Sequence, residues 1–410
     1  MAPHPTAHRL PSRHPLPPHT QTMNRRDFLH TCSAGLAGLA AAPMAAAPTV
    51  VPEPLLRRVR IPDWARREID AALTRYRRWR GDDLTVAFPY VTDLHAKRPA
   101  LTNGLDDFSD SKMHVFLAQL AADEADADFL ADLGDIELDL SRVVSPPGKW
   151  PPDFQPGALA DVRARLATHA ELYRHWGRPV LFALGNHDHA NRRISSREFG
   201  QALNVGVTQA QGHPTVLSPD GDHGYLDLPA KRVRVLFLNS SDEGYYGYSL
   251  AQLRFLAGAL SSLADGWTAL LLQHFCIRTD IGHWTSFPDT KARRQETAIA
   301  ILEAFVARGR GEAEGLRWDF SGLRDQAFAG CFFGDSHFDH HLSEHGVAYT
   351  ISQGYGTIRD QDLIPGAVRT RFECRTQMLV DLVAVKPARR QVRVFRIGAG
   401  GEARDRGYGY

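Results

Sequence analysis

The sequence predicts an α/β fold, and three observations lead to this prediction. Hydrophobic residues make up 43% and charged residues 23% of the 410 residues, a composition typical of a chain that buries a core. Short apolar runs of strand length alternate along the chain with longer segments of helical periodicity. Polar clusters follow several of these runs directly. Strands that alternate with helices indicate an α/β fold with a substantial sheet.

Between residues 62 and 184, the expected order of elements is helix, strand, helix, strand, helix and strand. Residues 62–80 are expected to form a helix, because Pro62 suits a first helical turn and Trp64, Ile69 and Leu73 recur at near-helical spacing. The remaining elements expected here are strands at residues 84–91, 128–133 and 179–184 and helices at residues 112–125 and 158–176.

The second half continues the alternation and then becomes mostly strand. Helices are expected at residues 250–263 and 291–308, and strands at residues 269–273, 327–333, 347–352, 378–385 and 391–397. No internal repeat is evident, and no linker divides residues 50–410. Residues 48–410 are therefore expected to form a single domain, with an N-terminal helix and C-terminal strands.

The balance of charges gives no indication that the protein binds an anionic polymer such as nucleic acid. Lysine and arginine together number 48 and aspartate and glutamate 47, which leaves a formal net charge of +1. A nucleic-acid-binding protein normally shows a basic stripe, and none interleaved with aromatic residues occurs in the body of the chain. No nucleic-acid partner is expected.

The N-terminal residues 1–47 have the features of a leader. Arg25 and Arg26 precede an apolar run of small residues at 32–47, which is too short and too rich in alanine and glycine to hold a transmembrane helix. This order resembles a bacterial twin-arginine export signal, with the twin-arginine export machinery as partner and a periplasmic or secreted location. Translation is expected to start at Met23, leaving residues 1–22 untranslated. The alternative is a disordered tail that contains two arginines.

The rest of the chain is expected to hold no transmembrane segment, because no other stretch approaches 18 consecutive apolar residues.

Five polar clusters fall at or just after the ends of predicted strands. They are Asp93-Leu94-His95, Gly134-Asp135, Gly185-Asn186-His187-Asp188, His274, and Gly334-Asp335-Ser336-His337. In open α/β sheets, ligands bind at the carboxyl ends of the strands. A single Gly-Asp or histidine after a strand is ordinary turn chemistry. Five such clusters together predict one site rich in carboxylates and imidazoles.

A buried set of such groups is costly unless metal ions or other partners satisfy it. Mixed histidine, aspartate and asparagine ligands suit manganese, iron or zinc. The clusters therefore favour a metal site.

In type and order, the five clusters resemble the motifs of the calcineurin-like metallophosphoesterase superfamily. The resemblance covers roughly residues 84–355, and the Gly-Asn-His-Asp element is its most specific part. It implies a two-sheet α/β/β/α sandwich, two divalent metal ions and hydrolysis of a small-molecule phosphate ester, either a monoester or a diester.

The resemblance also implies a role for each motif residue. Asp93, His95 and His337 would hold the first ion, Asp135 would bridge, and Asn186 and His274 would hold the second. His187 would face the substrate as general acid or hydrogen-bond donor. Asp188 would orient His187.

One position departs from the family pattern. Asp335 stands where the superfamily has the first histidine of Gly-His-x-His, a ligand of the second ion. Asp335 also suits a metal ion, but it adds a negative charge and favours a harder ion. Loss of the second ion is the alternative. Two other functions stay open: a metal-holding protein that binds a ligand without turnover, and a nuclease.

Overall fold

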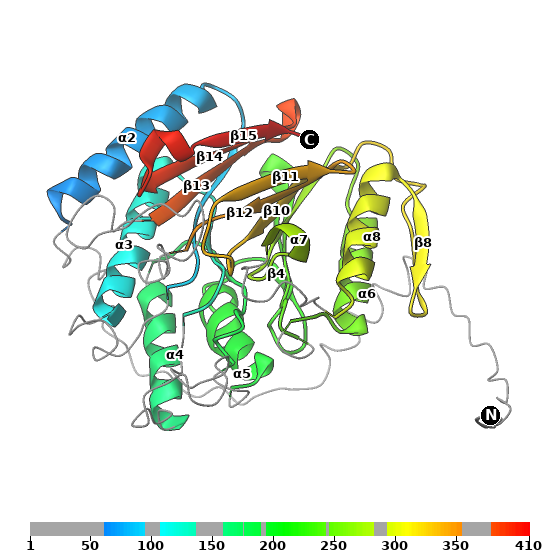
Figure 1. Ribbon diagram of the computed structural model, residues 1–410, viewed down its shortest axis with the longest axis horizontal. Coiled ribbons are helices and arrows are strands. Elements are labelled where there is room, and N and C mark those ends of the chain that lie inside the picture. Colours follow the sequence, from blue (N-terminus) through cyan, green and yellow to red (C-terminus); the bar gives the residue numbers. More distant parts are fainter. Residues whose placement is uncertain are drawn as a thin grey trace, which may run out of the picture. The chain divides into compact units, whose positions relative to one another are not determined.

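Two packed β-sheets with helices on their outer faces make up the fold (Figure 1). The fold is that of a computed structural model, which describes residues 61–94, 107–136, 159–174, 176–189, 194–242, 246–282, 293–354 and 379–410. At residues 107–113, 161 and 279 this covers the backbone alone. The predicted leader at residues 1–47 lies outside these ranges.

The six-stranded sheet has the strand order β15-β14-β13-β1-β2-β3. Strands β1 (Val86–Val91), β2 (Leu130–Asp132) and β3 (Val180–Phe182) run parallel to one another. Three C-terminal strands extend this sheet, and each pairs antiparallel with its neighbour. β13 (Leu379–Lys386) pairs with β1, β14 (Gln391–Gly398) with β13, and β15 (Arg406–Gly409) with β14. The C-terminal strands thus complete the sheet that the first strand begins.

The seven-stranded sheet has the strand order β11-β12-β10-β7-β6-β5-β4. Its four central strands are parallel: β6 (Val233–Phe237), β7 (Thr268–Leu272), β10 (Ala327–Phe333) and β12 (Val347–Ile351). Its edges are antiparallel: β4 (Thr215–Leu217) and β5 (Gly224–Leu228) on one side, and β11 (His340–Glu344) on the other. A separate hairpin joins β8 (Arg310–Ala313) to β9 (Leu316–Asp319).

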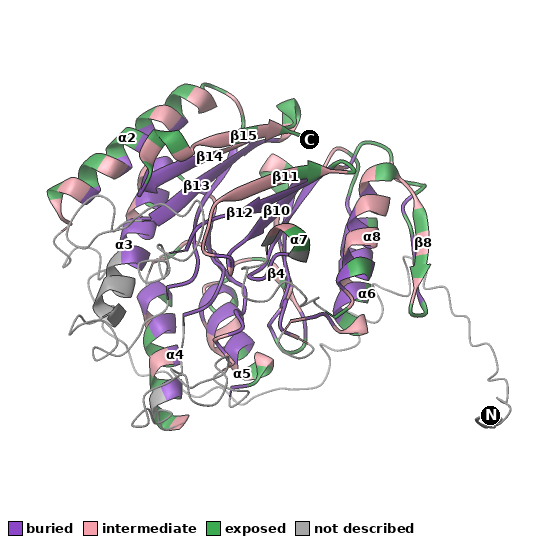
Figure 2. Cartoon of the chain, viewed as in Figure 1, coloured by how far each residue is buried: buried purple, intermediate pink, exposed green. Residues whose placement is uncertain are grey.

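Successive side chains of a strand point to opposite faces of its sheet, so the core has three layers: one between the sheets and one under the helices on each side. In β1, Phe88 packs between the sheets with side chains such as Phe332, whereas Ala87 and Val91 face the helices. The helices α2 (Asp63–Arg80), α3 (Asp107–Ala125) and α4 (Leu159–Arg174) cover the outer face of the six-stranded sheet. The helices α6 (Leu250–Ser261) and α8 (Gln295–Ala307) cover the other sheet. Figure 2 shows the buried residues along these inward faces.

The predicted two-sheet α/β/β/α sandwich is confirmed by this architecture. Each predicted helix and strand appears within a few residues of its expected bounds, and residues 327–333 match β10 at both ends. The sequence-based prediction missed the strands of 215–237, the hairpin of 310–319 and the edge strands β11 and β15. It also missed the helical turns α5 (Ser196–Gly200), η3 (Gln201–Gln209) and α7 (Thr279–Gly282).

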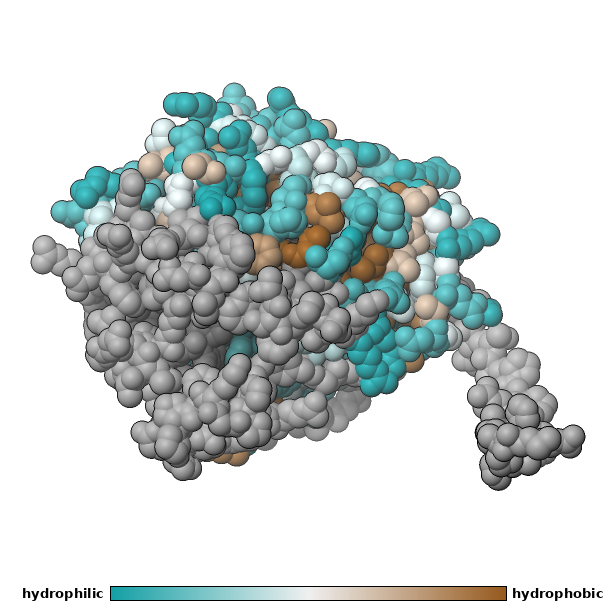
Figure 3. Space-filling model, viewed as in Figure 1, coloured by the Kyte–Doolittle hydropathy of each residue, from teal (hydrophilic) through white to brown (hydrophobic). Residues whose placement is uncertain are grey.

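The described surface is largely polar. Hydrophilic side chains cover most of the face in Figure 3 that is coloured by hydropathy. Among the described residues, the exposed large hydrophobic side chains are Leu84 and Val216. None of the described helices is long and apolar enough to span a membrane.

Candidate metal centre

The two sheets bring the predicted clusters to one edge. Asp93, Asp135 and Asn186 lie just beyond the carboxyl ends of β1, β2 and β3, and His274 and Asp335 just beyond those of β7 and β10. Backbone hydrogen bonds join neighbouring strand ends: the Asp93 amide donates to Gly134 O at 2.9 Å, and the Gly334 amide to His274 O at 2.9 Å. Candidate ligands from five separate strands therefore face a common point.

Three of these residues, and His337 two positions after Asp335, have a left-handed backbone. The φ angles are +54° at Asp93, +55° at Asp135, +63° at Asp335 and +57° at His337. This conformation is disfavoured for residues with a Cβ atom, though aspartate tolerates it better than most, and it costs roughly 1 kcal/mol per residue. Strained backbone of this kind is concentrated at functional sites. Here the four residues lie within four positions of a strand end.

Four glycines allow the loops to approach the two central carboxylates. A Cβ atom at Gly334 or Gly354 would lie 2.7 Å from Asp93 Oδ2, and one at Gly185 would overlap the Asp135 carboxylate. A Cβ atom at Gly134 would overlap the backbone at Gly185. A real Cβ atom essentially never comes that close to another heavy atom, so the loops close around the carboxylates only because these positions lack side chains.

Asp93 lies fully buried between its own strand and the loop after β10. Its Oδ2 atom accepts hydrogen bonds from Thr92 Oγ1 at 2.7 Å and from the Asp335 amide at 3.0 Å. Its Oδ1 atom lies 3.1 Å from Nε2 of His337. One oxygen is thus fixed by the protein, and the other faces an imidazole nitrogen.

The His274 ring is oriented with one nitrogen toward the cluster. Its Nδ1 atom lies 2.7 Å from the Leu133 carbonyl oxygen. Because a carbonyl oxygen can only accept a hydrogen bond, Nδ1 carries a proton and donates it. In the neutral ring, Nε2 therefore carries the lone pair. Nε2 lies 3.0 Å from Asn186 Oδ1, 3.3 Å from Asp135 Oδ2 and 3.6 Å from Asp335 Oδ1. This tautomer is the one that a metal ligand requires.

Asp135 connects this group to the Gly-Asn-His-Asp loop. Its Oδ1 atom accepts from the His187 amide at 2.9 Å, and its own amide donates to Asp188 Oδ2 at 2.9 Å. Asp188 Oδ2 also accepts from the Gly185 amide at 2.9 Å. The buried Asp188 carboxylate thus joins the loops after β2 and β3, a contact that its predicted role of orienting His187 did not include.

The His187 side chain stands apart from the buried ligands. It is 28% exposed, and its Nε2 atom lies 4.0 Å from Asp135 Oδ2. It is therefore placed to meet a molecule that enters from solvent.

Burial and charge act strongly on the titratable groups here. Burial and the neighbouring Asp135 carboxylate raise the pKa of Asp188 to about 8. Burial works against the charged form of His274, but the carboxylates of Asp135, Asp335 and Asp93 outweigh it and hold the pKa of His274 well above its ordinary value. The enclosed carboxylates thus favour positive charge at the centre of the cluster.

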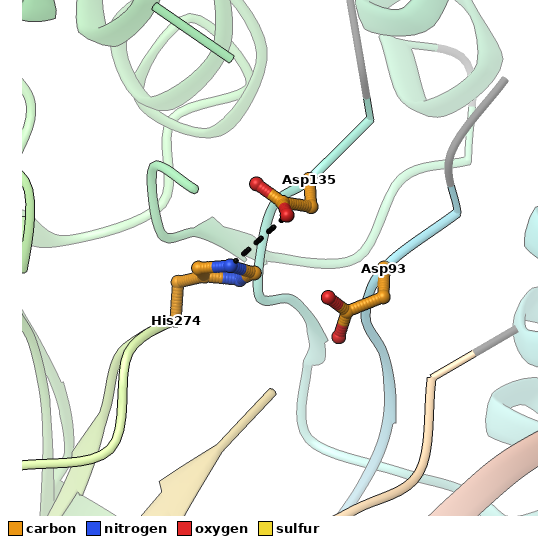
Figure 4. A group of neighbouring side chains, drawn as sticks. All are labelled: Asp93, Asp135 and His274. Carbon is orange, nitrogen blue, oxygen red and sulfur yellow. Dashed lines mark ion pairs between the residues drawn. The ribbon is translucent and has the colours of Figure 1, made fainter. Parts of the chain in front are cut away.

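The donor set fits metal ions. Ligand atoms of Asp93, Asp135 and His274 all lie within 4.8 Å of one another, and the three residues are buried. Figure 4 shows the three side chains turned toward one another. Asn186 Oδ1 and Asp335 Oδ1 face the same His274 nitrogen. Oxygen and imidazole donors that converge at this spacing suit divalent ions of the first transition row, and such ions offset the close approach of the carboxylates.

Most of the predicted site residues come together. Asp93, Asp135, Asn186, His274, Asp335 and His337 form the cluster, and His187 and Asp188 adjoin it. His95 lies outside the described residues. No sequence pattern had pointed to Thr92, whose hydroxyl holds Asp93, or to Gly354, which lies against it.

Known structures resemble this fold. No protein-family model and no curated protein sequence matches the chain. A dimetal phosphatase from Danio rerio superposes with a TM-score of 0.50 at 13% identity, over 79% of this chain and 99% of that one. At that identity the likeness establishes the fold alone, which is of the metallophosphoesterase type.

Two further structural similarities have TM-scores below 0.5 and support no conclusion. Purple acid phosphatase PPD1 from yellow lupin (Lupinus luteus) seeds has a TM-score of 0.44 at 10% identity, over 80% of this chain and 53% of its own. GAP50, described as the anchor in the inner membrane complex of Plasmodium, has a TM-score of 0.45 at 9% identity, over 79% of this chain and 88% of its own.

Proposed function

We propose that this protein hydrolyses small-molecule phosphate esters with the help of two divalent metal ions. The observation that carries the proposal is the convergence of Asp93, Asp135 and His274 from three different strands, with buried ligand atoms within 4.8 Å of one another. A structural role alone does not account for so many strained, inward-turned polar residues at the ligand-binding edge of an α/β fold.

We assign the described candidate ligands to two proposed ion positions. Asp93 and His337 would hold one ion, and Asn186, His274 and Asp335 the other, with Asp135 between them. His95 is proposed as a further ligand of the first ion. When bound, the ions would supply Lewis-acid polarisation of the phosphoryl group and neutralise its charge.

His187 is proposed as the residue that acts on the substrate itself. Its backbone is fixed by the hydrogen bond to Asp135, while its ring is partly exposed beside the cluster. An imidazole in that place donates a proton to the leaving oxygen or a hydrogen bond to a phosphoryl oxygen. Asp188 holds the loop that carries it, through the amides of Asp135 and Gly185.

We further propose that the protein acts outside the cytoplasm, after export by the twin-arginine machinery. The support for this is the Arg25-Arg26 pair and the apolar, small-residue run that follows it. Export in the folded state would let the chain acquire its ions beforehand. Fusion of residues 1–47 to a reporter, with Arg25 and Arg26 both changed to lysine as control, tests the signal. Export that is unaffected by this change would overturn the proposal.

Two measurements test the enzymatic proposal. Metal analysis of the purified protein is expected to give close to two ions per chain. With manganese, iron or zinc supplied in turn, the protein is expected to hydrolyse p-nitrophenyl phosphate or its bis-ester. Two bound ions without turnover of either ester would instead favour a metal-holding binding protein.

A further inference from the structure

We infer that Asp335 sets both the metal and the substrate class of the proposed site: a harder divalent ion, manganese rather than zinc, and a singly charged phosphodiester rather than a monoester. This inference rests on the proposed function. It follows from one carboxylate that lies among the candidate ligands.

The backbone holds the Asp335 carboxylate toward the cluster. The Asp335 amide donates to Asp93 Oδ2 at 3.0 Å, and the residue has a φ of +63°. Its Oδ1 atom lies 3.6 Å from His274 Nε2, and its side chain is only 13% exposed. An aspartate in a loop ordinarily points to solvent, so this inward orientation indicates a ligand.

The donors around His274 are mainly oxygens. Asn186 Oδ1, Asp135 Oδ2 and Asp335 Oδ1 lie at 3.0, 3.3 and 3.6 Å from Nε2, so three oxygens accompany one nitrogen. Carboxylate and carbonyl oxygens suit magnesium and manganese, whereas imidazole suits zinc. With a histidine at position 335, two of the four donor atoms would be nitrogens. The aspartate therefore moves this position toward the harder ions.

The same carboxylate lowers the charge that a substrate meets. Asp93, Asp135 and Asp335 together carry three negative charges beside the two proposed ions. Two divalent ions then leave one net positive charge, whereas a neutral residue at position 335 would leave two. A dianionic monoester gains more from the second positive charge than a monoanionic diester does, because Coulomb energy scales with the product of the charges. Asp335 thus favours the diester.

Two substitutions separate these effects. Asp335→Asn keeps an oxygen donor but removes the charge, and asparagine tolerates the left-handed backbone at this position. Asp335→His removes the charge and replaces the oxygen by nitrogen. Circular dichroism on both variants confirms that the fold is retained.

The first experiment measures metal preference without any substrate. Metal-free protein is dialysed against equimolar Mn²⁺ and Zn²⁺, and the bound ions are counted by mass spectrometry. We expect the ratio of manganese to zinc to fall about tenfold in Asp335→His. In Asp335→Asn we expect it to stay within about threefold of the parent value. An unchanged ratio in a folded Asp335→His variant would overturn the ligand assignment.

The second experiment measures kcat/KM for bis-p-nitrophenyl phosphate and for p-nitrophenyl phosphate. We expect the diester-to-monoester ratio to fall about tenfold in both variants, because both lose the charge. A ratio that stays unchanged in Asp335→Asn would overturn the substrate inference. If the parent protein hydrolyses neither ester, the proposed function fails, while the dialysis experiment still tests Asp335 as a ligand.

Discussion

At the scale of single residues, the candidate centre depends on backbone conformations that most side chains avoid. Asp93, Asp135, Asp335 and His337 all have left-handed φ angles and lie two to four residues beyond the end of a strand. The chain must therefore change direction within two to four residues of each strand end to present a ligand to the common point. The strain is stored where the sheet meets the site, and the close glycines make the geometry possible.

His187 and Asp135 are expected to fail in different ways when substituted. His187→Ala should retain both ions and lose roughly 10²- to 10⁴-fold in rate, because the role proposed for this side chain is proton transfer rather than metal binding. Asp135→Asn should lose activity together with most of the bound metal, because its carboxylate is proposed to lie between the two ion positions. Metal content and kcat of the two variants check this. Loss of metal from His187→Ala would show that His187 is a ligand.

Gly334 provides a test of the close approach to Asp93. In Gly334→Ala the added Cβ atom would lie 2.7 Å from Asp93 Oδ2 and would also overlap Thr92. We expect a loss of about 1–3 kcal/mol in the free energy of unfolding and weaker metal binding, because Asp93 must move. Gly322→Ala is the matched control, since a Cβ atom there meets nothing within 4 Å. Equal metal affinity in the two variants would contradict the expected displacement.

At the scale of elements, the C-terminal strands support the loops of the centre. Arg396 on β14 is fully buried, and its guanidinium donates to Asp381 Oδ1 on β13 at 2.7 Å and to Asp339 Oδ1 at 2.5 Å. Asp339 lies two residues beyond His337 and also accepts from the Gln353 amide at 3.0 Å. One arginine thus connects the six-stranded sheet to both loops that contact Asp93, those of His337 and Gly354.

Arg396→Lys is expected to loosen these loops while keeping the charge. Lysine lacks the planar guanidinium with its fixed donor directions, so it should hold the two carboxylates less firmly in their present positions. Arg234→Lys is the matched control, because Arg234 is also buried and donates to both oxygens of Asp227 at 2.7 Å, but at the start of β6, away from the site. Both variants should lose roughly 1–3 kcal/mol of stability.

Only Arg396→Lys should also weaken metal binding, by about tenfold or more. Isothermal titration with Mn²⁺, well below the unfolding temperature of each variant, measures this. If both variants bound metal as tightly as the parent, Arg396 would be part of the scaffold without influence on the centre.

The sequence predicted the strands that carry the centre because each is an apolar run closed by a polar cluster. It did not predict the partners of those strands. The run at residues 233–238 is apolar apart from Arg234, yet it is not among the predicted strands. The pairing of β13 with β1 joins residues nearly three hundred positions apart, and no local pattern encodes such a contact.

The same limit applies to the residues around the centre. Asp339 forms an ion pair with the buried Arg396, and its local sequence gives no sign of that partner. That partner lies on a strand whose sequence shows only alternation. Motif residues are predictable because they recur in fixed local patterns, whereas the groups that hold them depend on tertiary packing.

At the scale of the whole molecule, buried carboxylates link stability to pH. Asp222 is buried and joins the turn before β5 to the chain after β6. Burial opposes its charged form, but hydrogen bonds from His223, Asn239 and Ser218 outweigh this and lower the pKa of Asp222 to about 2. A carboxyl group whose pKa is lower in the folded state stabilises the protein above its unfolded pKa of 3.8. That stability is lost as the pH falls from 3.8 through about 2.

Asp222→Asn should therefore be less stable than the parent protein at pH 5 by about 2 kcal/mol, and this difference should shrink toward zero near pH 2. Asparagine has no titratable proton, so Asp222→Asn does not undergo the loss of stability that protonation of Asp222 causes in the parent protein at low pH. Urea unfolding at a series of pH values measures the difference. Asp220→Asn, which changes an exposed carboxylate two residues away, is the control and should show no such convergence. A difference between Asp222→Asn and the parent that stays constant from pH 5 to pH 2 would show that the Asp222 charge contributes nothing to the acid stability of the fold.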